Sequence, residues 1–96
     1  MAQFLVEYRD VGTSEAREAH RARHIAYRKG LGDAILVAGP ILDDQGKSVG
    51  SLVILEAEDH TRAAQLASGD PYLNCGVLEL LSVRGYRIAA MRPSSA

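Results

Sequence analysis

Apolar residues gather in four short runs along the chain, and polar or glycine-containing segments separate them. Enrichment in Val, Ile, Leu and aromatic residues predicts four strands, at residues 4–8 ("FLVEY"), 34–42 ("AILVAGPIL"), 48–58 ("SVGSLVILEAE") and 78–90 ("LELLSVRGYRIAA"). Gly39-Pro40 interrupts the second run, and proline cannot donate to a sheet ladder, so we expect this end of the strand at a sheet edge or a bulge. "DDQGK" has turn composition and predicts a hairpin between the second and third strands.

The segment from Glu15 to about Gly30 is rich in Ala, Arg and Glu, which favour a helix. Thr13 or Ser14 is available to cap its start, and Gly30 and Gly32 end it. One sector of its helical wheel holds small or apolar residues, and we expect that sector to lie close against the sheet: Ala19, Ala22, Ile25 and Ala26.

A second, shorter helix is predicted within "DHTRAAQLASG". Asp59 is its expected N-cap. Its apolar positions are Ala63, Ala64, Leu66 and Ala67.

The resulting order, β-α-β-β-α-β, predicts an α+β, ferredoxin-like protomer with an antiparallel sheet and both helices on one face. The central runs "ILVAG" and "SLVILEA" are apolar at consecutive rather than alternate positions. A sheet with one solvated face should alternate, so the face without helices also needs a cover. We expect a second copy of the same sheet to supply it, as a symmetric homodimer.

Length and charge narrow the class of protein. The chain has 96 residues, so we expect one domain over residues 1–96, with about 92–96 as a frayed tail. Its 11 basic and 12 acidic residues give a net charge of -1, which argues against nucleic-acid or membrane partners. The first residues are too polar for a signal peptide, and no apolar run approaches the roughly 20 residues of a membrane helix. We expect a cytoplasmic protein.

Three histidines and one cysteine were weighed for chemistry. His20 and His24 lie four residues apart on a helix, as in some zinc sites, but no third ligand stands at a supporting spacing and "RAR" between them would repel a cation. We therefore predict no metal. His60 is expected to be exposed, and Cys75 lies in an apolar setting typical of a small buried side chain rather than a nucleophile.

Asp70 is open to two interpretations. It precedes Pro71, which biases its backbone away from helix, at the point where the chain turns back toward the sheet. It could form an Asx-type turn, or its carboxylate could fix the tautomer of a histidine for general acid or base chemistry.

Four segments together resemble the YciI-like (YCII-related) family: "RARHIAY" (21–27), "LVAGPIL" (36–42), "GSLVILEAED" (50–59) and "DPYLNCGV" (70–77). The resemblance implies a ferredoxin-like protomer that dimerises through its sheet face into a dimeric α/β barrel. It also implies a pocket between helices and sheet that holds a His–Asp pair, with His24 and Asp70 at the matching positions. Arg21, Gly39, Pro40 and Tyr72 match positions that would bind substrate, and His20 matches nothing.

The function that this resemblance favours is a cofactor-free lyase or isomerase that acts on a small cyclic or aromatic anion, as in dehydrochlorinase relatives. His24 would act as general base or acid, with Asp70 orienting it, and Arg21 or a backbone N–H near Gly39 would stabilise an anionic intermediate. One alternative is a ligand-binding or accessory module without turnover. The other is purely structural, with His24 on the helix rim and Asp70 capping a turn; the position of His24 away from the Ala19/Ala22/Ala26 sector favours it slightly.

Overall fold

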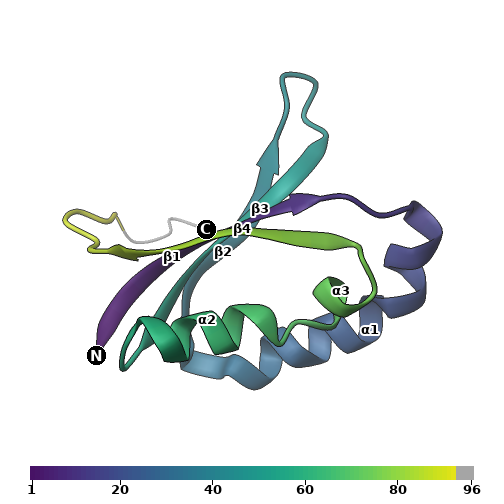
Figure 1. Cartoon of the computed structure of the whole chain (residues 1–96). Helices are drawn as coiled ribbons and strands as arrows, with labels where there is room; N and C mark the ends of the chain where they lie inside the picture. Colours follow the sequence, from purple (N-terminus) through teal and green to yellow (C-terminus); the bar gives the residue numbers. More distant parts are fainter. Residues whose placement is uncertain (93–96) are drawn as a thin grey trace.

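A four-stranded antiparallel sheet carries all the helices on one side (Figure 1). The computed structural model describes residues 1–92. Its elements run in the order β1 (Ala2–Asp10), α1 (Ser14–Leu31), a 3₁₀ turn η1 (Gly32–Ala34), β2 (Ile35–Leu42), β3 (Ser48–Ala57), α2 (His60–Ser68), α3 (Pro71–Asn74) and β4 (Leu78–Tyr86). The strand order across the sheet is β2-β3-β1-β4. The predicted ferredoxin-like β-α-β-β-α-β arrangement is confirmed, with η1 and α3 as additions.

The strand predictions differ from the structure mainly at their ends. β2 is an edge strand, as Pro40 requires, but it continues through Gly39-Pro40 to Leu42. β4 ends at Tyr86 rather than near residue 90. Tyr86 pairs with Gln3, which is only the second residue of β1, so almost no β1 residues remain with which β4 could pair further. Most of the predicted frayed tail, residues 93–96, lies outside the described residues. The β2–β3 hairpin extends beyond the rest of the protein (Figure 1).

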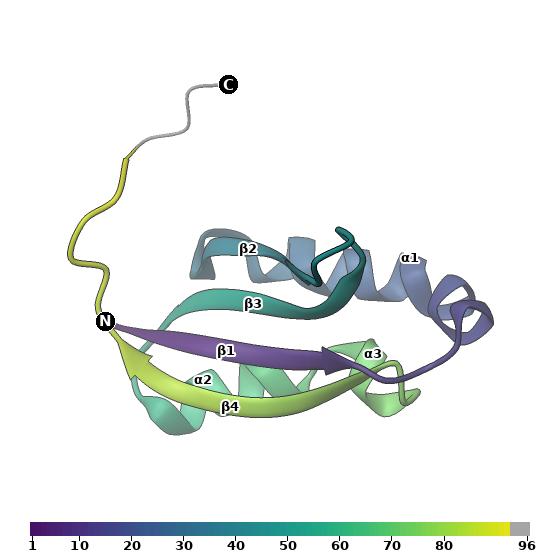
Figure 2. The same cartoon turned by 90° about the horizontal axis from the view of Figure 1, so that it is seen from above.

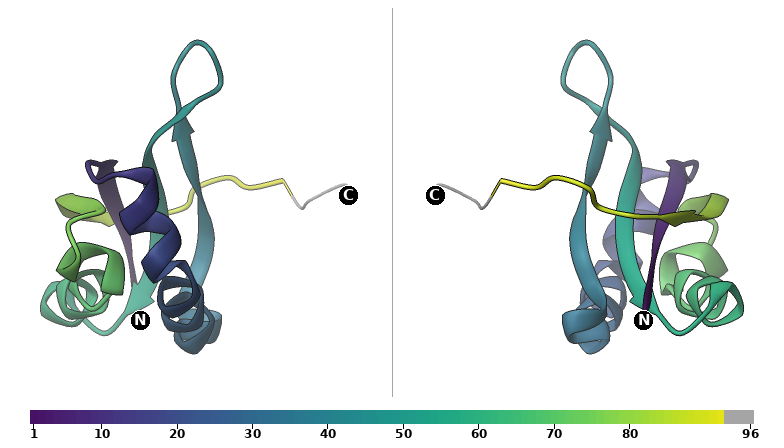
Figure 3. Two further views of the ribbon diagram at one scale, coloured as in Figure 1. Left: turned by 90° about the vertical axis from the view of Figure 1, so that its right-hand side faces the viewer. Right: turned by 90° about the vertical axis from the view of Figure 1, so that its left-hand side faces the viewer.

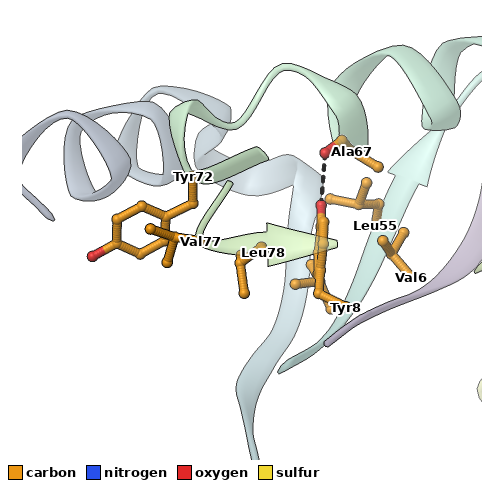
Figure 4. Close-up of a cluster of buried hydrophobic side chains, with 8 residues drawn as sticks. Val6, Tyr8, Leu55, Ala67, Tyr72, Val77 and Leu78 are labelled. Carbon is orange, nitrogen blue, oxygen red and sulfur yellow. Dashed lines mark hydrogen bonds between the residues drawn. The ribbon is translucent and has the colours of Figure 1, made fainter. Parts of the chain in front are cut away.

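The core lies between the sheet and α2. Alternate residues of β1 point inward, and their partners on β3 do the same: Phe4 opposite Leu55 and Val6 opposite Val53. α2 covers them with small side chains that are completely or almost completely buried, namely Ala63 and Ala67. Tyr8 belongs to the main cluster of buried residues, and its hydroxyl donates to the Ala67 carbonyl at 2.8 Å (Figure 4).

α1 relates to the sheet differently, and one prediction about it is wrong. The four residues of the predicted sheet-facing sector, Ala19, Ala22, Ile25 and Ala26, are all exposed. α1 contains no buried residue, and it lies beside the β2–β3 half of the sheet, whereas α2 and α3 lie beside the β4 half (Figures 2 and 3). The wheel sector failed as a guide because the middle of α1 faces inward with long side chains such as His24 and Arg28. The apolar residues of α1 that pack against the core, Ala16 and Leu31, lie near the two ends of the helix.

Both ends of α1 follow sequence rules. The Thr13 side chain accepts from the Ala16 N–H at 3.1 Å, so Thr13 is the N-cap. Gly32 ends the helix with φ of 56°, a left-handed conformation that glycine adopts without strain. These caps fix the limits of α1 and therefore which of its turns lies over the short helix α3.

Candidate functional site

The turn after α2 is built around a buried carboxylate. Asp70 is 1% exposed and is the N-cap of α3; its Oδ1 accepts from the Tyr72 N–H at 3.0 Å. Pro71 stands in the first turn of this helix, where its missing N–H costs nothing and its fixed φ suits a helix start. The local sequence Asp-Pro-Tyr therefore turns the chain and also holds a carboxylate inside the protein.

The structure brings His24 of α1 onto this carboxylate. Its Nδ1 lies 2.8 Å from both Asp70 oxygens, and its ring stacks on Tyr72 with centroids 4.0 Å apart and planes 8° from parallel. A carboxylate can only accept, so Nδ1 carries the proton and donates it. In the neutral ring Nε2 is then the acceptor, and no hydrogen-bond partner for it occurs within residues 1–92.

Arg28 completes the surroundings of Asp70, and sequence reasoning missed it. Its Nε donates to Asp70 Oδ2 at 3.0 Å, and its side chain is only 18% exposed. The signal was available in the spacing, because residue 28 lies one turn after His24 and so on the same side of the helix. Arg28 lies just outside the motif segment 21–27 and outside the apolar wheel sector, so neither of these signals pointed to it.

These groups face a hollow of about 270 Å³ between α1 and the β2–β3 edge of the sheet. Glycine at position 50 is required there, since a Cβ would lie 2.4 Å from the Tyr8 carbonyl oxygen. Three predicted pocket residues, Gly39, Pro40 and Tyr72, line this hollow with His24. The other lining residues are Asp10, Arg17, Arg28, Ala38, Ser48, Gly50, Ser51 and Leu78.

Arg21 is the predicted site residue that the structure places elsewhere. It is exposed and lines a neighbouring hollow beside the start of α1, together with Lys47. The two hollows share Asp10, Arg17 and Ser48. Arg17 is therefore the arginine of this helix region that faces both hollows; its guanidinium lies 3.2 Å from Asp10 and over the Tyr72 ring, 5.2 Å from the centroid.

The phenols around the pair are protonated at neutral pH. Burial raises the pKa of Tyr8 to about 12 and raises the pKa of Tyr72 and of Tyr27 above the usual value. The Tyr72 hydroxyl donates to the Arg17 carbonyl at 3.1 Å, which fixes the ring on which His24 stacks. Tyr72 thus orients the imidazole and adds no charge.

The remaining residues that were weighed lie apart from this hollow. His20 contacts Arg23, and both line a separate hollow with Cys75. His60 is exposed, as predicted, and its Nε2 lies 2.8 Å from the Val83 carbonyl oxygen. Within residues 1–92 no three His, Cys, Asp or Glu side chains converge as a metal site would require. The helices of this part of the chain include none with the length and hydropathy of a membrane span.

Comparison with known proteins shows which family the chain belongs to. Among solved structures, 5-chloro-2-hydroxyhydroquinone dehydrochlorinase (TftG) from Burkholderia phenoliruptrix AC1100, in complex with 2,5-dihydroxybenzoquinone, matches with a TM-score of 0.63 and 26% sequence identity, over 88% of this chain and 92% of that one. No curated protein matches. The model of the YCII-related domain matches residues 1–87, and the chain belongs to this family.

Proposed function

We propose that this protein is a cofactor-free enzyme of the lyase or isomerase type, in which His24 moves a proton of a small cyclic or aromatic anion. The observation that carries the proposal is the hydrogen bond between His24 Nδ1 and the buried Asp70 carboxylate, which directs the lone pair of Nε2 away from Asp70. The similarity to a dehydrochlorinase solved with a dihydroxybenzoquinone supports the ring-shaped substrate.

The hollow suits such a substrate in size and charge. At about 270 Å³ it is slightly smaller than the pockets of roughly 300–1,000 Å³ that hold drug-sized molecules, so a single substituted ring is the fitting size. The charged residues that line it are Arg17, Arg28 and Asp10, and each arginine is paired with a carboxylate, Arg17 with Asp10 and Arg28 with Asp70. Backbone and small side chains of β2 form the opposite wall, at Gly39 and Pro40.

The chemistry follows from the tautomer. In an elimination, Nε2 accepts a proton from the substrate, the electron pair of the broken bond becomes a double bond, and the leaving group departs with its own bonding pair. In an isomerisation, the imidazolium returns the proton to a different atom. In both cases the Asp70 carboxylate stabilises the imidazolium that forms, and Arg17, whose guanidinium faces the hollow, stabilises negative charge on the substrate.

Turnover and binding should be measured together on chlorinated hydroxyhydroquinones, 2,5-dihydroxybenzoquinone and lactones. We expect His24→Ala to lower turnover by about 10²–10⁴-fold, the usual contribution of a positioned general base or acid. His20→Ala is the matched control, since His20 lies on the same helix but lines another hollow. Binding without turnover of any of these compounds would identify a ligand-binding module, and unchanged turnover in His24→Ala would exclude His24 as the base.

We also propose that a second copy covers the sheet face opposite the helices. Leu5, Ile54 and Val37 are neighbours in register across β1, β3 and β2, and they alternate with the inward residues, so they form an apolar row on that face. Val37 is 41% exposed. Burying such a row contributes about 25 cal/mol for each Å² removed from water. Light scattering should give the mass of a dimer at micromolar concentration, and Val37→Glu should give a monomer; a monomeric native protein would contradict the proposal.

A further inference from the structure

Asp70 is hydrogen-bonded by two different cationic or cationisable side chains. His24 Nδ1 and Arg28 Nε both reach Oδ2, at 2.8 and 3.0 Å, while Oδ1 also accepts from the Tyr72 N–H. With 1% exposure, the carboxylate has almost no contact with solvent. Its charge must therefore be balanced inside the protein.

Arg28 alone can balance that charge. A guanidinium is always protonated in proteins, so the Asp70–Arg28 pair is neutral before the imidazole is considered. A buried carboxylate whose only partner is histidine favours the imidazolium. Here the second partner is already positive, and adding an imidazolium gives the three side chains a net charge of +1. The charge of Asp70 is therefore balanced without a proton on His24 Nε2.

The other groups around His24 do not alter this balance. On α1, Arg17 pairs with Asp10 of β1 at 3.2 Å, so their charges cancel. Arg21 and Glu18 of the same helix act on the Tyr72 ring, on which His24 stacks, and they carry opposite charges. Tyr72 of α3 and the two phenols near Asp70 and Arg28, Tyr27 of α1 and Tyr8 of β1, are uncharged at neutral pH. From β2 and β3 the lining residues of the hollow are Ala38, Gly39, Pro40, Ser48, Gly50 and Ser51, which carry no charge.

The Arg28 guanidinium makes few contacts other than its ion pair with Asp70. Its guanidinium carbon lies over the Tyr8 ring, 5.5 Å from the centroid. Its Nη2 is buried and has no hydrogen-bond partner within the described residues 1–92. An unsatisfied buried donor costs free energy, about 1–3 kcal/mol for a neutral group and more for a charged one, so the ion pair with Asp70 and the contact with Tyr8 must offset that cost.

From this geometry we propose that Arg28 is a positioning residue that sets the charge state of the His24–Asp70 pair and keeps His24 in the neutral, proton-accepting form. The inference rests on the proposed function for the role of Nε2. Its physical content, a coupling of charges among three side chains, is measurable without any substrate.

The test is the NMR titration of the His24 ring Cε1–H. In Arg28→Gln or Arg28→Met we expect the midpoint of the His24 titration to rise by about one pH unit or more. The Asp70 carboxylate then has no other positive partner among the described residues, and an opposite charge within a few ångströms moves such midpoints by about 1–3 units. Met retains the apolar stem over Tyr8. Arg23→Gln is the matched control: it removes an exposed arginine of the same helix that does not contact Asp70, and the midpoint should not move.

If Arg28→Gln and Arg28→Met do not fold because Asp70 has lost its ion-pair partner, a second pair of variants tests the same coupling. Asp70→Asn should lower the midpoint of the His24 titration, since no negative charge then balances the positive charge of Arg28. The double variant Asp70→Asn with Arg28→Gln removes both buried charges and should raise the midpoint again. A His24 midpoint that is the same with and without Arg28, in either background, would overturn the proposal. That result would leave turnover by His24 untouched, whereas absence of turnover in the native protein would leave the titration shifts intact.

Discussion

α2 and α1 cover the same face of one sheet, yet they serve opposite purposes. α2 lays two buried alanines, Ala63 and Ala67, directly onto the strands, while α1 buries no residue and faces the hollow with His24 and Arg28. Close contact between small side chains excludes everything else from the α2 half. The longer side chains of α1 leave a hollow lined by both polar and apolar residues. Where a helix is set back from its sheet, a site can form beneath it.

The largest expected change in the free energy of unfolding concerns Tyr8, whose hydroxyl donates to the Ala67 carbonyl of α2. Its pKa is about 12 in the folded protein against 10.0 for an unperturbed tyrosine, so the folded state holds its proton where the unfolded chain has lost it. The stabilisation is complete below pH 10 and disappears as pH rises to 12, a loss on the order of 3 kcal/mol.

Urea unfolding at several pH values measures this loss. Tyr8→Phe should remove most of the alkaline fall in the free energy of unfolding between pH 10 and 12. Tyr86→Phe, at an exposed tyrosine of β4, should retain it. An equally steep fall in Tyr8→Phe would mean that another group is responsible.

Enlarging an alanine should distinguish the two helices next. Ala67→Leu inserts a side chain where Ala67 is 1% exposed, and overpacking of this kind costs about 2 kcal/mol. Ala22→Leu in the exposed sector of α1 should change the free energy of unfolding by less than about 0.5 kcal/mol. A comparable cost in both variants would show that another surface covers the exposed sector of α1 in solution.

The smallest effect is at the helix starts. The Asp59 side chain accepts from the Arg62 N–H at 2.9 Å, and Asp59→Ala should destabilise by about 1 kcal/mol in thermal or urea unfolding. Thr13→Ala removes the corresponding cap of α1. We expect Asp59→Ala to destabilise the protein more than Thr13→Ala, because α2 packs buried alanines onto the core whereas α1 buries no residue. The reverse pattern would contradict the division between the helices.

The two helices also show where sequence reasoning succeeds. The apolar runs, the turn at "DDQGK" and the cap at Asp59 are local signals, and they predicted the strands, the hairpin and α2. The inward side of α1 is not a local property, because alanine is equally compatible with solvent and with a sheet. It depends on whether partners such as Asp70 lie within reach, and Arg28 was missed for that reason.

The site residues were predicted through motif resemblance rather than through periodicity. The pattern Asp-Pro-Tyr pointed to Asp70 and Tyr72, and both lie against His24. Arg21 matched a motif, yet its side chain is exposed beside a neighbouring hollow. Motif spacing indicates which turn of a helix matters, whereas the direction of each side chain follows only from how the helix is rotated about its axis.

The turn formed by Asp70, Pro71 and Tyr72 holds the imidazole in two directions at once. Asp70 anchors the edge of the ring and Tyr72 supports its face, and only the ring-constrained Pro71 separates them. The edge and the face of the His24 ring are thus both held by one short segment of backbone with restricted flexibility. The orientation of the imidazole is therefore set by three consecutive residues of another segment as well as by the helix that carries it.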